Sequence, residues 1–152
     1  ASTAAAALNL GTPNHIVVTN STSLCKVYIN GVEAASVASG ASFTGYSNAT
    51  ILIGGESGFA YSNSNISGVA VWDRAIAPSE ISELYSVGTG SVLTSNYHWT
   101  MNNNDYLSGS IEYHKDKIAN TENMRVYGSV ARVDGRVGDA IQFGSGNLNN
   151  YL

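Results

Sequence analysis

Charge is scarce in this sequence. Charged residues occupy 12% of the 152 positions, about half the share found in an average soluble domain. The seven Lys and Arg residues form no cluster, and the formal net charge is −4. Because a nucleic-acid interface needs a basic face, this composition argues against nucleic acid as a partner. Neutral hydroxyl and amide side chains are abundant instead, which is common in secreted, cell-surface and particle-coat β proteins.

The sequence also has little cysteine and no long apolar run. Cys25 is the single cysteine, so no internal disulfide can form. It alternates with Val27 and Ile29, which predicts that the three side chains share one strand face and that the thiol is buried and inert. No apolar run approaches the length of a membrane-spanning helix, so we expect no membrane insertion.

The sequence does contain short apolar runs between residues 14 and 85, each about one strand long and bounded by Gly, Asn or Ser. In the first run, Ile16 and Val18 are predicted to lie on one face over the core. Asn30-Gly31 is the strongest hairpin signal, because both positions of such a turn favour positive φ. Residues 66–73 predict one continuous strand.

One short helix is predicted over residues 79–85, with Pro78 at its first position, where the missing N–H costs nothing. Past residue 91, the segments 97–100, 124–133 and 136–143 alternate as strands. The charged segment 111–123 predicts a surface loop. Trp72 and Trp99 fall in strand patterns, so we expect both in the core.

Five motifs between residues 15 and 85 follow one another in the order that a known family has. They are a His-hydrophobic-Thr strand, a Tyr-Ile-Asn-Gly hairpin, an Ile-Gly-Gly strand end, a Gly-x-hydrophobic strand and a Glu-Ile-x-x-Leu-Tyr helix. Together they resemble the laminin-G-like (LamG) branch of the concanavalin A-like lectin/glucanase superfamily. The resemblance implies an all-β fold, an antiparallel jelly roll or β-sandwich with one short helix.

A second resemblance to the same family covers residues 97–143, and it concerns the opposite end of the domain. An aromatic strand, an Asp-x-x-Ser-Gly turn and a Gly-x-Val-Gly-x-Ala strand resemble the start of such a domain. Residues 1–90 therefore resemble its C-terminal half, and residues 91–152 its N-terminal half.

This reversed order of halves has three explanations: parts of two tandem domains, one permuted domain with fewer strands, or halves completed by neighbouring copies. An incomplete sandwich leaves edges and core exposed, so we expect self-association or pairing with neighbouring domains.

No pair of carboxylates fits glycoside hydrolysis, which needs two carboxyl groups flanking one bond. The glucanase relatives place Glu residues two and four apart on one strand, and no strand here does so. Glu80 and Glu83 lie on the predicted helix, where we interpret them as a solvated face. We therefore predict that the chain is not an enzyme.

Asp105, in an Asn-rich turn, is the candidate ligand for Ca²⁺, because carboxylate and amide oxygens are its preferred donors. The resemblance supports this site, since relatives often hold calcium near the corresponding turn. The alternative, which we favour, is a turn satisfied by its own backbone. Where relatives have Ile-Asp-Glu-Val on a late strand, residues 69–72 read Val-Ala-Val-Trp, which weakens any metal or hydrolytic site there.

Aromatic side chains in two Gly- and Ser-rich loops suggest carbohydrate binding, because a flat ring can lie on a sugar face and amides can bind its hydroxyls. The candidate contacts are Tyr46, Phe59, Tyr61 and Asn63. The alternative is that these rings cover the core beneath the loops.

Three Asn-x-Ser/Thr sequons fall at predicted turns, so N-glycosylation is feasible at Asn20, Asn48 and Asn65 in a secretory pathway. Chance matches are the alternative in a chain so rich in Asn and Ser.

Taken together, the sequence predicts a non-catalytic, lectin-like module for glycan binding or adhesion, located outside the cell or on a particle surface. The alternative is a structural subunit of a fibril, coat or tail whose sandwich is completed by neighbouring chains.

Overall fold

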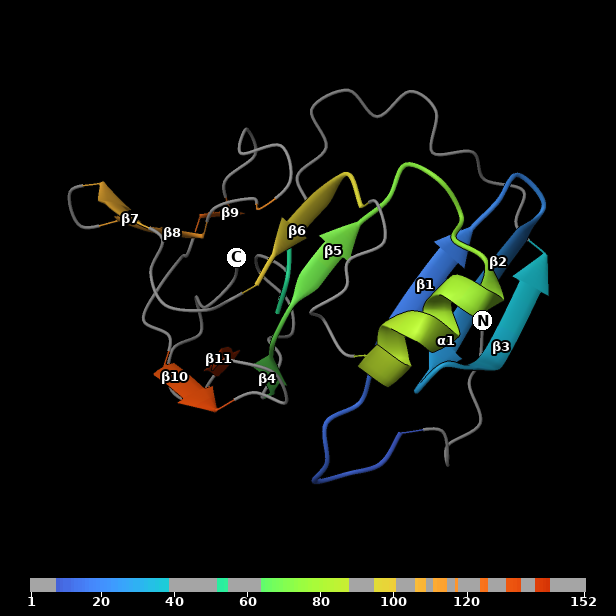
Figure 1. The fold of residues 1–152 in the computed structure, drawn as a ribbon, viewed down its shortest axis with the longest axis horizontal. Coiled ribbons are helices and arrows are strands. Elements are labelled where there is room, and N and C mark those ends of the chain that lie inside the picture. The colour runs from blue at the N-terminus through green and yellow to red at the C-terminus, as the bar shows by residue number, and fades with distance from the viewer. Residues whose placement is uncertain are drawn as a thin grey trace. The chain divides into compact units, whose positions relative to one another are not determined.

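The computed structural model describes a set of segments that are drawn as coloured ribbon in Figure 1. These are residues 8–38, 52–54, 64–87, 95–100, 106–108, 111–114, 117, 124–125, 131–134 and 139–142. The chain divides into two compact units, which we describe separately. Unit 1 comprises Ala1–Asn48 and Trp72–Thr94, and unit 2 comprises Ala49–Val71 and Ser95–Leu152.

Unit 1 is built on a three-stranded antiparallel sheet. Its strands β1 (Ile16–Asn20), β2 (Leu24–Ile29) and β3 (Val32–Ala38) lie side by side in chain order. Asn30 and Gly31 connect β2 to β3 with φ values of 52° and 81°, and Ile29 pairs with Val32 across them. Two positive φ values in a two-residue hairpin are the signature of a type I′ turn, so the predicted hairpin is confirmed.

The one helix among the described residues, α1 (Pro78–Val87), lies against this sheet (Figure 1). Pro78 is its first residue, as predicted. Ile81 and Leu84 are buried on its sheet-facing side, with Ile81 0% exposed. Their spacing of three residues places both on one side of the helix. They pack with Val17 of β1 and Tyr28 of β2, and Ile76 and Trp72 complete the cluster.

The strand register assigns the paired residues of the sheet to one of two faces. Val17 is opposite Tyr28, and both belong to the face that carries the core with α1, which we call the inner face. Ile16 and Val18 share the opposite face, as predicted, but the prediction that they cover the core is wrong. They are 55% and 63% exposed, and Val17 between them is buried. A bulge between Val27 and Tyr28 shifts the β2–β3 register by one residue.

The described part of unit 2 consists of short strands in small antiparallel sheets. Three strands form the order β10-β11-β4, two form β5-β6, and three form β7-β8-β9. The bounds are β4 (Asn65–Ile66), β5 (Val69–Val71), β6 (Tyr97–Trp99), β7 (Tyr106–Ser108), β8 (Ile111–His114), β9 (Met124–Arg125), β10 (Ala131–Asp134) and β11 (Asp139–Gln142).

Two of these pairings join segments from either side of α1 in the sequence. Strand β5 pairs with β6, placing Val69 opposite Trp99, and β4 pairs with β11, placing Ile66 opposite Ile141. The Asn96 amide also donates a 2.8 Å hydrogen bond to the Val71 carbonyl. Unit 2 thus combines strands from both of the halves inferred from motif order, while the division at residues 90 and 91 stays a prediction.

The core of unit 2 is aromatic and aliphatic. Trp99 and Met124 are buried at its centre, and the partly buried Ile53, Ile66, Val69, Val71 and Tyr97 pack against them. Tyr97 and Trp99 lie on the same side of β6, and their rings stack with centroids 5.8 Å apart. The predictions that Trp99 is buried and that Trp72 packs against a core are confirmed.

The all-β prediction with one short helix is confirmed, and two details differ. The strand predicted over residues 66–73 is split into β4 and β5, because Gly68 between them has a φ of 60° that interrupts the extended backbone. The surface loop predicted over residues 111–123 begins with β8, which pairs with β7 and β9. Its four residues, Ile-Glu-Tyr-His, alternate apolar and polar, a strand signal that the local charge obscured.

Candidate functional site

Most of the predicted site residues lie outside the described residues. This holds for the four candidate glycan contacts Tyr46, Phe59, Tyr61 and Asn63, for the calcium candidate Asp105 and for the sequon residue Asn48. The other two sequon residues are described. Asn20 ends β1 and is half-buried, whereas Asn65 begins β4 and is exposed.

The two faces of the unit 1 sheet differ sharply in their polar side chains. On the inner face, Lys26 Nζ lies 2.7 Å from Glu33 Oε2 in an exposed ion pair. The hydrogen bond between them lowers the pKa of Glu33 and raises the pKa of Lys26. The two side chains are 28% and 38% exposed, so this part of the inner face is solvated. Exposed pairs of this kind contribute little to stability.

The opposite face, which we call the outer face, carries no charge. Its residues, assigned by the register, are Ile16, Val18, Asn20, Cys25, Val27, Ile29, Val32, Ala35 and Val37. Cys25 therefore shares a face with Val27 and Ile29, as predicted, and its thiol is half-buried.

Exposure on the outer face is concentrated on the two flanking strands. Val32 of β3 is 69% exposed and Val37 is 42% exposed, alongside Ile16 and Val18 of β1, while Ile29 in the central strand is buried. Exposed apolar side chains on a folded sheet are candidates for an interaction surface, because water contact with these side chains is unfavourable. These four side chains make the outer face a candidate surface for binding another macromolecule.

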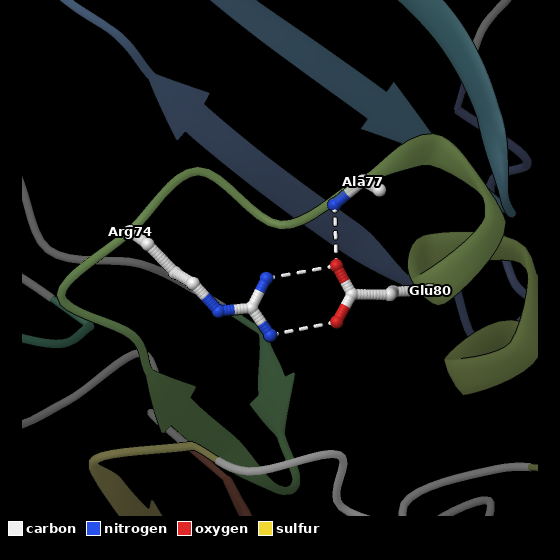
Figure 2. Close-up of polar contacts among 3 residues, drawn as sticks. All are labelled: Arg74, Ala77 and Glu80. Atoms are coloured by element: carbon white, nitrogen blue, oxygen red, sulfur yellow. Dashed lines mark hydrogen bonds and ion pairs between the residues drawn. The ribbon is translucent and has the colours of Figure 1, made fainter.

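A charged cap fixes the start of the helix that covers the inner face. The Arg74 guanidinium donates two hydrogen bonds, of 2.9 and 2.7 Å, to the two carboxylate oxygens of Glu80. Glu80 Oε2 also accepts a 2.6 Å hydrogen bond from the Ala77 amide, and Figure 2 shows all three contacts. Ala77 immediately precedes the helix, so Glu80 binds a backbone donor that the helix leaves unpaired.

These contacts lower the pKa of Glu80 from 4.5 to about 2, first through the hydrogen bond from Arg74 and then through that from Ala77. A carboxylate held ionised in this way is a poor proton donor near neutral pH, which suits a structural cap and not a general acid. Glu80 remains partly exposed to solvent in these contacts, so they add a capping role to the predicted solvated face. The sequence carried half of the capping-box signal, with Glu at the third helical position but Ala77 in place of the usual Ser or Thr.

The turn between β2 and β3 holds the loop that precedes β1. The Asn30 Oδ1 accepts a 2.9 Å hydrogen bond from the His15 amide, and the Asn30 amide donates one of 2.8 Å to the His15 carbonyl. The Asn30 Nδ2 donates to Asn14 Oδ1 at 3.2 Å. We call Asn14, His15 and Asn30 the turn junction. Sequence reasoning identified Asn30 only as a turn former and missed its side-chain contacts.

Asn14 extends the turn junction into the loop. Its Nδ2 donates to the carbonyls of Asn9 and Thr12, at 2.8 and 3.0 Å, and its Oδ1 accepts from the Asn9 amide at 3.0 Å. On the other side of the turn, the Tyr85 ring of α1 lies 3.2 Å from where a side chain on Gly31 would begin. The turn thus contacts both the loop and the helix.

Neither a metal cluster nor a membrane span is found in the part of the chain that the structure describes. No three His, Cys, Asp or Glu side chains gather there in a way that could hold a metal ion. Among the same residues, no helix has the length and apolar character needed to cross a bilayer.

Comparison with known proteins gives one family match. The family model described as the concanavalin A-like lectin/glucanases superfamily, of laminin G type, matches residues 1–82, more than half of the chain. The matched stretch includes the three-stranded sheet of unit 1 and the first half of α1. No curated protein and no solved structure matches the chain. On the strength of the family match and its antiparallel sheets, the chain belongs to the concanavalin A-like lectin/glucanase superfamily.

Proposed function

We propose that the chain is a non-catalytic, lectin-like module that binds glycans and mediates adhesion outside the cell or on a particle surface. The observation that carries this proposal is the family match over residues 1–82. All four candidate glycan contacts, Tyr46, Phe59, Tyr61 and Asn63, fall inside the matched stretch. Aromatic rings and an amide are the side chains that a sugar site requires.

The scaffold of unit 1 supports this proposal physically. A binding loop needs a rigid frame, and the sheet of unit 1 is anchored by the buried cluster around Ile81 and by the capped helix. Residues 39–51, which include Tyr46, follow β3 directly in the chain. The family match and the composition of this stretch together favour a glycan site that includes Tyr46.

A glycan array tests this function most simply. We expect the wild-type chain to bind a defined subset of glycans, and Tyr46→Ala and Tyr61→Ala each to weaken that binding at least about fivefold, as the loss of one aromatic stacking contact would. Val18→Thr is the matched control, because it changes the outer face and leaves both loops intact. Circular dichroism confirms that each variant is folded. Absence of any glycan binding by the wild type would reject the proposal.

The absence of catalysis is part of the same proposal. Laminin G-like domains are generally non-catalytic, although the wider superfamily includes glycosidases. Glu80, one of the two acidic residues of α1, is committed to the helix cap and to Arg74, which supports a structural role for it. Incubation with β-glucans should release no reducing ends.

Calcium binding at Asp105 also remains a prediction, tested by isothermal titration of CaCl₂ into the wild type and Asp105→Asn.

A second function, that of a structural subunit completed by neighbouring chains, is favoured by one specific observation. The outer face of the unit 1 sheet is apolar and free of charge, and four of its side chains (Ile16, Val18, Val32 and Val37) are more than 40% exposed. We infer that another copy of this chain covers that face in an assembly, burying these residues as one sheet stacks on another. Sedimentation of the chain in solution distinguishes this function from that of a monomeric lectin.

A further inference from the structure

Asn30-Gly31 is the single Asn-Gly pair in the chain, and this dipeptide has a chemistry of its own. The main-chain nitrogen that follows an asparagine can attack the side-chain carboxamide, and glycine allows the closest approach because it has no Cβ and adopts the widest range of backbone angles. Asparagine is for this reason among the thermolabile residues of proteins. The turn junction therefore places a reactive pair at the point where the loop, the sheet and the helix meet.

We propose that Asn30 is the principal site of spontaneous deamidation in this chain, and that the folded turn junction suppresses the reaction until it opens. In the reaction, the Gly31 nitrogen forms a bond to Asn30 Cγ and loses its proton, and the bond from Cγ to Nδ2 breaks with release of ammonia. Water then adds to either carbonyl of the resulting cyclic imide. The ring opens to aspartate or to isoaspartate, with no change in oxidation state.

Both ends of the Asn30 carboxamide are held in the folded chain. Its oxygen accepts from the His15 amide at 2.9 Å, and its nitrogen donates to Asn14 Oδ1 at 3.2 Å. To close the imide ring, Cγ must turn towards Gly31, and this movement breaks both hydrogen bonds. The main-chain hydrogen bond between the Asn30 amide and the His15 carbonyl, at 2.8 Å, further restricts the backbone at this residue.

Gly31, the attacking residue, is held as well. Its φ is 81°, and the Tyr85 side chain approaches it closely from the helix. Its carbonyl accepts a 3.4 Å hydrogen bond from Ser82 Oγ, also on α1. The nucleophile and the electrophile are thus fixed by different elements, one by the helix and the other by the loop before β1. If either element is released, the Gly31 nitrogen and Asn30 Cγ can approach one another more easily.

The products would disrupt the turn junction irreversibly. An aspartate at position 30 can still accept from His15, but it can no longer donate to Asn14 Oδ1, so two acceptor oxygens face one another. An isoaspartate adds a methylene group to the main chain and is incompatible with a two-residue type I′ turn. Either product weakens the contacts between residues 9–14 and the hairpin. Because the reaction is not reversed, the amount of deamidated Asn30 would increase with the time that the turn junction has spent open.

Peptide mapping by mass spectrometry tests this proposal on the intact chain. The wild type is incubated at neutral pH in native buffer and in urea, and the amide-to-acid conversion is followed at Asn30 and at Asn20, which precedes a serine. In urea we expect Asn30 to convert faster than Asn20. In native buffer we expect Asn30 to convert at least about tenfold more slowly than in urea, because ring closure must break two hydrogen bonds.

Two variants identify the contacts responsible. Asn14→Ala removes the acceptor of the Asn30 amide and should raise the native rate at Asn30 severalfold, with no effect in urea. Lys26→Ala, in the same sheet but outside the turn junction, should leave both rates unchanged. If Asn14→Ala unfolds, as circular dichroism would reveal, the wild-type comparison decides alone. Equal rates at Asn30 in native buffer and urea, or slower conversion than at Asn20 in urea, would overturn the proposal.

Discussion

The inner and outer faces of the unit 1 sheet both carry apolar side chains, but these side chains differ in how deeply they are buried. On the inner face, Val17 and Tyr28 are buried with Ile81 and Leu84 of α1. On the outer face, Ile16 and Val18 come from the same strand as Val17 and remain more than half exposed. Residues of one type and one strand therefore have two environments, one buried in the core and the other exposed on the face that we propose for association.

Charge follows the same division. The inner face includes the Lys26–Glu33 pair and is covered by a helix with an Arg74–Glu80 cap. The outer face has no charged residue that would oppose burial against another apolar surface. A sheet face in permanent contact with water usually carries charges that discourage pairing, so the lack of charge on the outer face supports the proposed association there.

The largest expected effect comes from removing a buried side chain from the core between α1 and the inner face. Ile81→Ala removes the most deeply buried side chain of unit 1 and should lower the free energy of unfolding by about 2–5 kcal/mol, measured by urea denaturation. Val87→Ala on the same helix is the control, because Val87 is 53% exposed, and its effect should stay within about 0.5 kcal/mol. Equal losses for the two variants would contradict the assignment of the core to the inner face.

A smaller effect is expected at the turn that brings the helix and the sheet together. Gly31→Ala places a Cβ about 3.2 Å from the Tyr85 ring at a φ of 81°, so it combines a conformational cost of about 1–2 kcal/mol with displacement of Tyr85. Gly11→Ala is a matched control, because Gly11 has a similar φ of 77° and nothing within 4 Å. Thermal unfolding should show the greater loss for Gly31→Ala, and the reverse order would contradict helix contact at the turn.

Acid should weaken the cap on the covering helix within a defined pH window. The folded-state pKa of Glu80 is about 2, below its ordinary value of 4.5. A lowered pKa means that Glu80 stabilises the fold fully above pH 4.5 and that this contribution disappears as the pH falls towards 2. Glu80→Gln should therefore flatten the loss of stability over that window, as measured by thermal unfolding at several pH values.

The control for the cap is Glu83→Gln, which removes the same charge from the same helix but leaves the cap intact. It should retain the acid-dependent loss of the wild type. If both glutamine variants behaved alike, net charge and not the cap would account for the pH dependence.

The smallest expected effect on folding is on the outer face. Val18→Thr exchanges one β-branched side chain for another at a position that is 63% exposed. The free energy of unfolding should change by no more than about 0.5 kcal/mol. A loss comparable to that of Ile81→Ala would show that Val18 is part of the folding core and would remove the difference between the two faces.

Local rules were sufficient to predict much of unit 1. The Asn30-Gly31 turn, the helix beginning at Pro78 and the pairing of Ile81 with Leu84 on one helix face all depend on residues close in sequence. The side of the sheet on which α1 packs could not be predicted, because Val17 and Val18 are equally apolar and only tertiary packing decides which is buried. The sequence therefore predicted the strand and missed its orientation.

Unit 2 shows the same limit more strongly, because its strands are short and their partners distant. Val69 pairs with Trp99, and Ile66 with Ile141, and such separations leave no local signal. In the candidate sites, the Glu80 cap had a recognisable sequence signature, whereas the link from Asn30 to Asn14 did not. Two asparagines sixteen residues apart become partners only when β1 and β2 are in register.

The role of the outer face as an association surface is tested most directly by sedimentation velocity at micromolar concentration. The wild-type chain should sediment as an oligomer whose proportion increases with concentration. Val18→Lys, which places a charge on that face, should shift it to a folded monomer, whereas Val87→Lys on the helix should leave the oligomer intact. A wild-type chain that stays monomeric across this range, or an oligomer insensitive to Val18→Lys, would contradict the account.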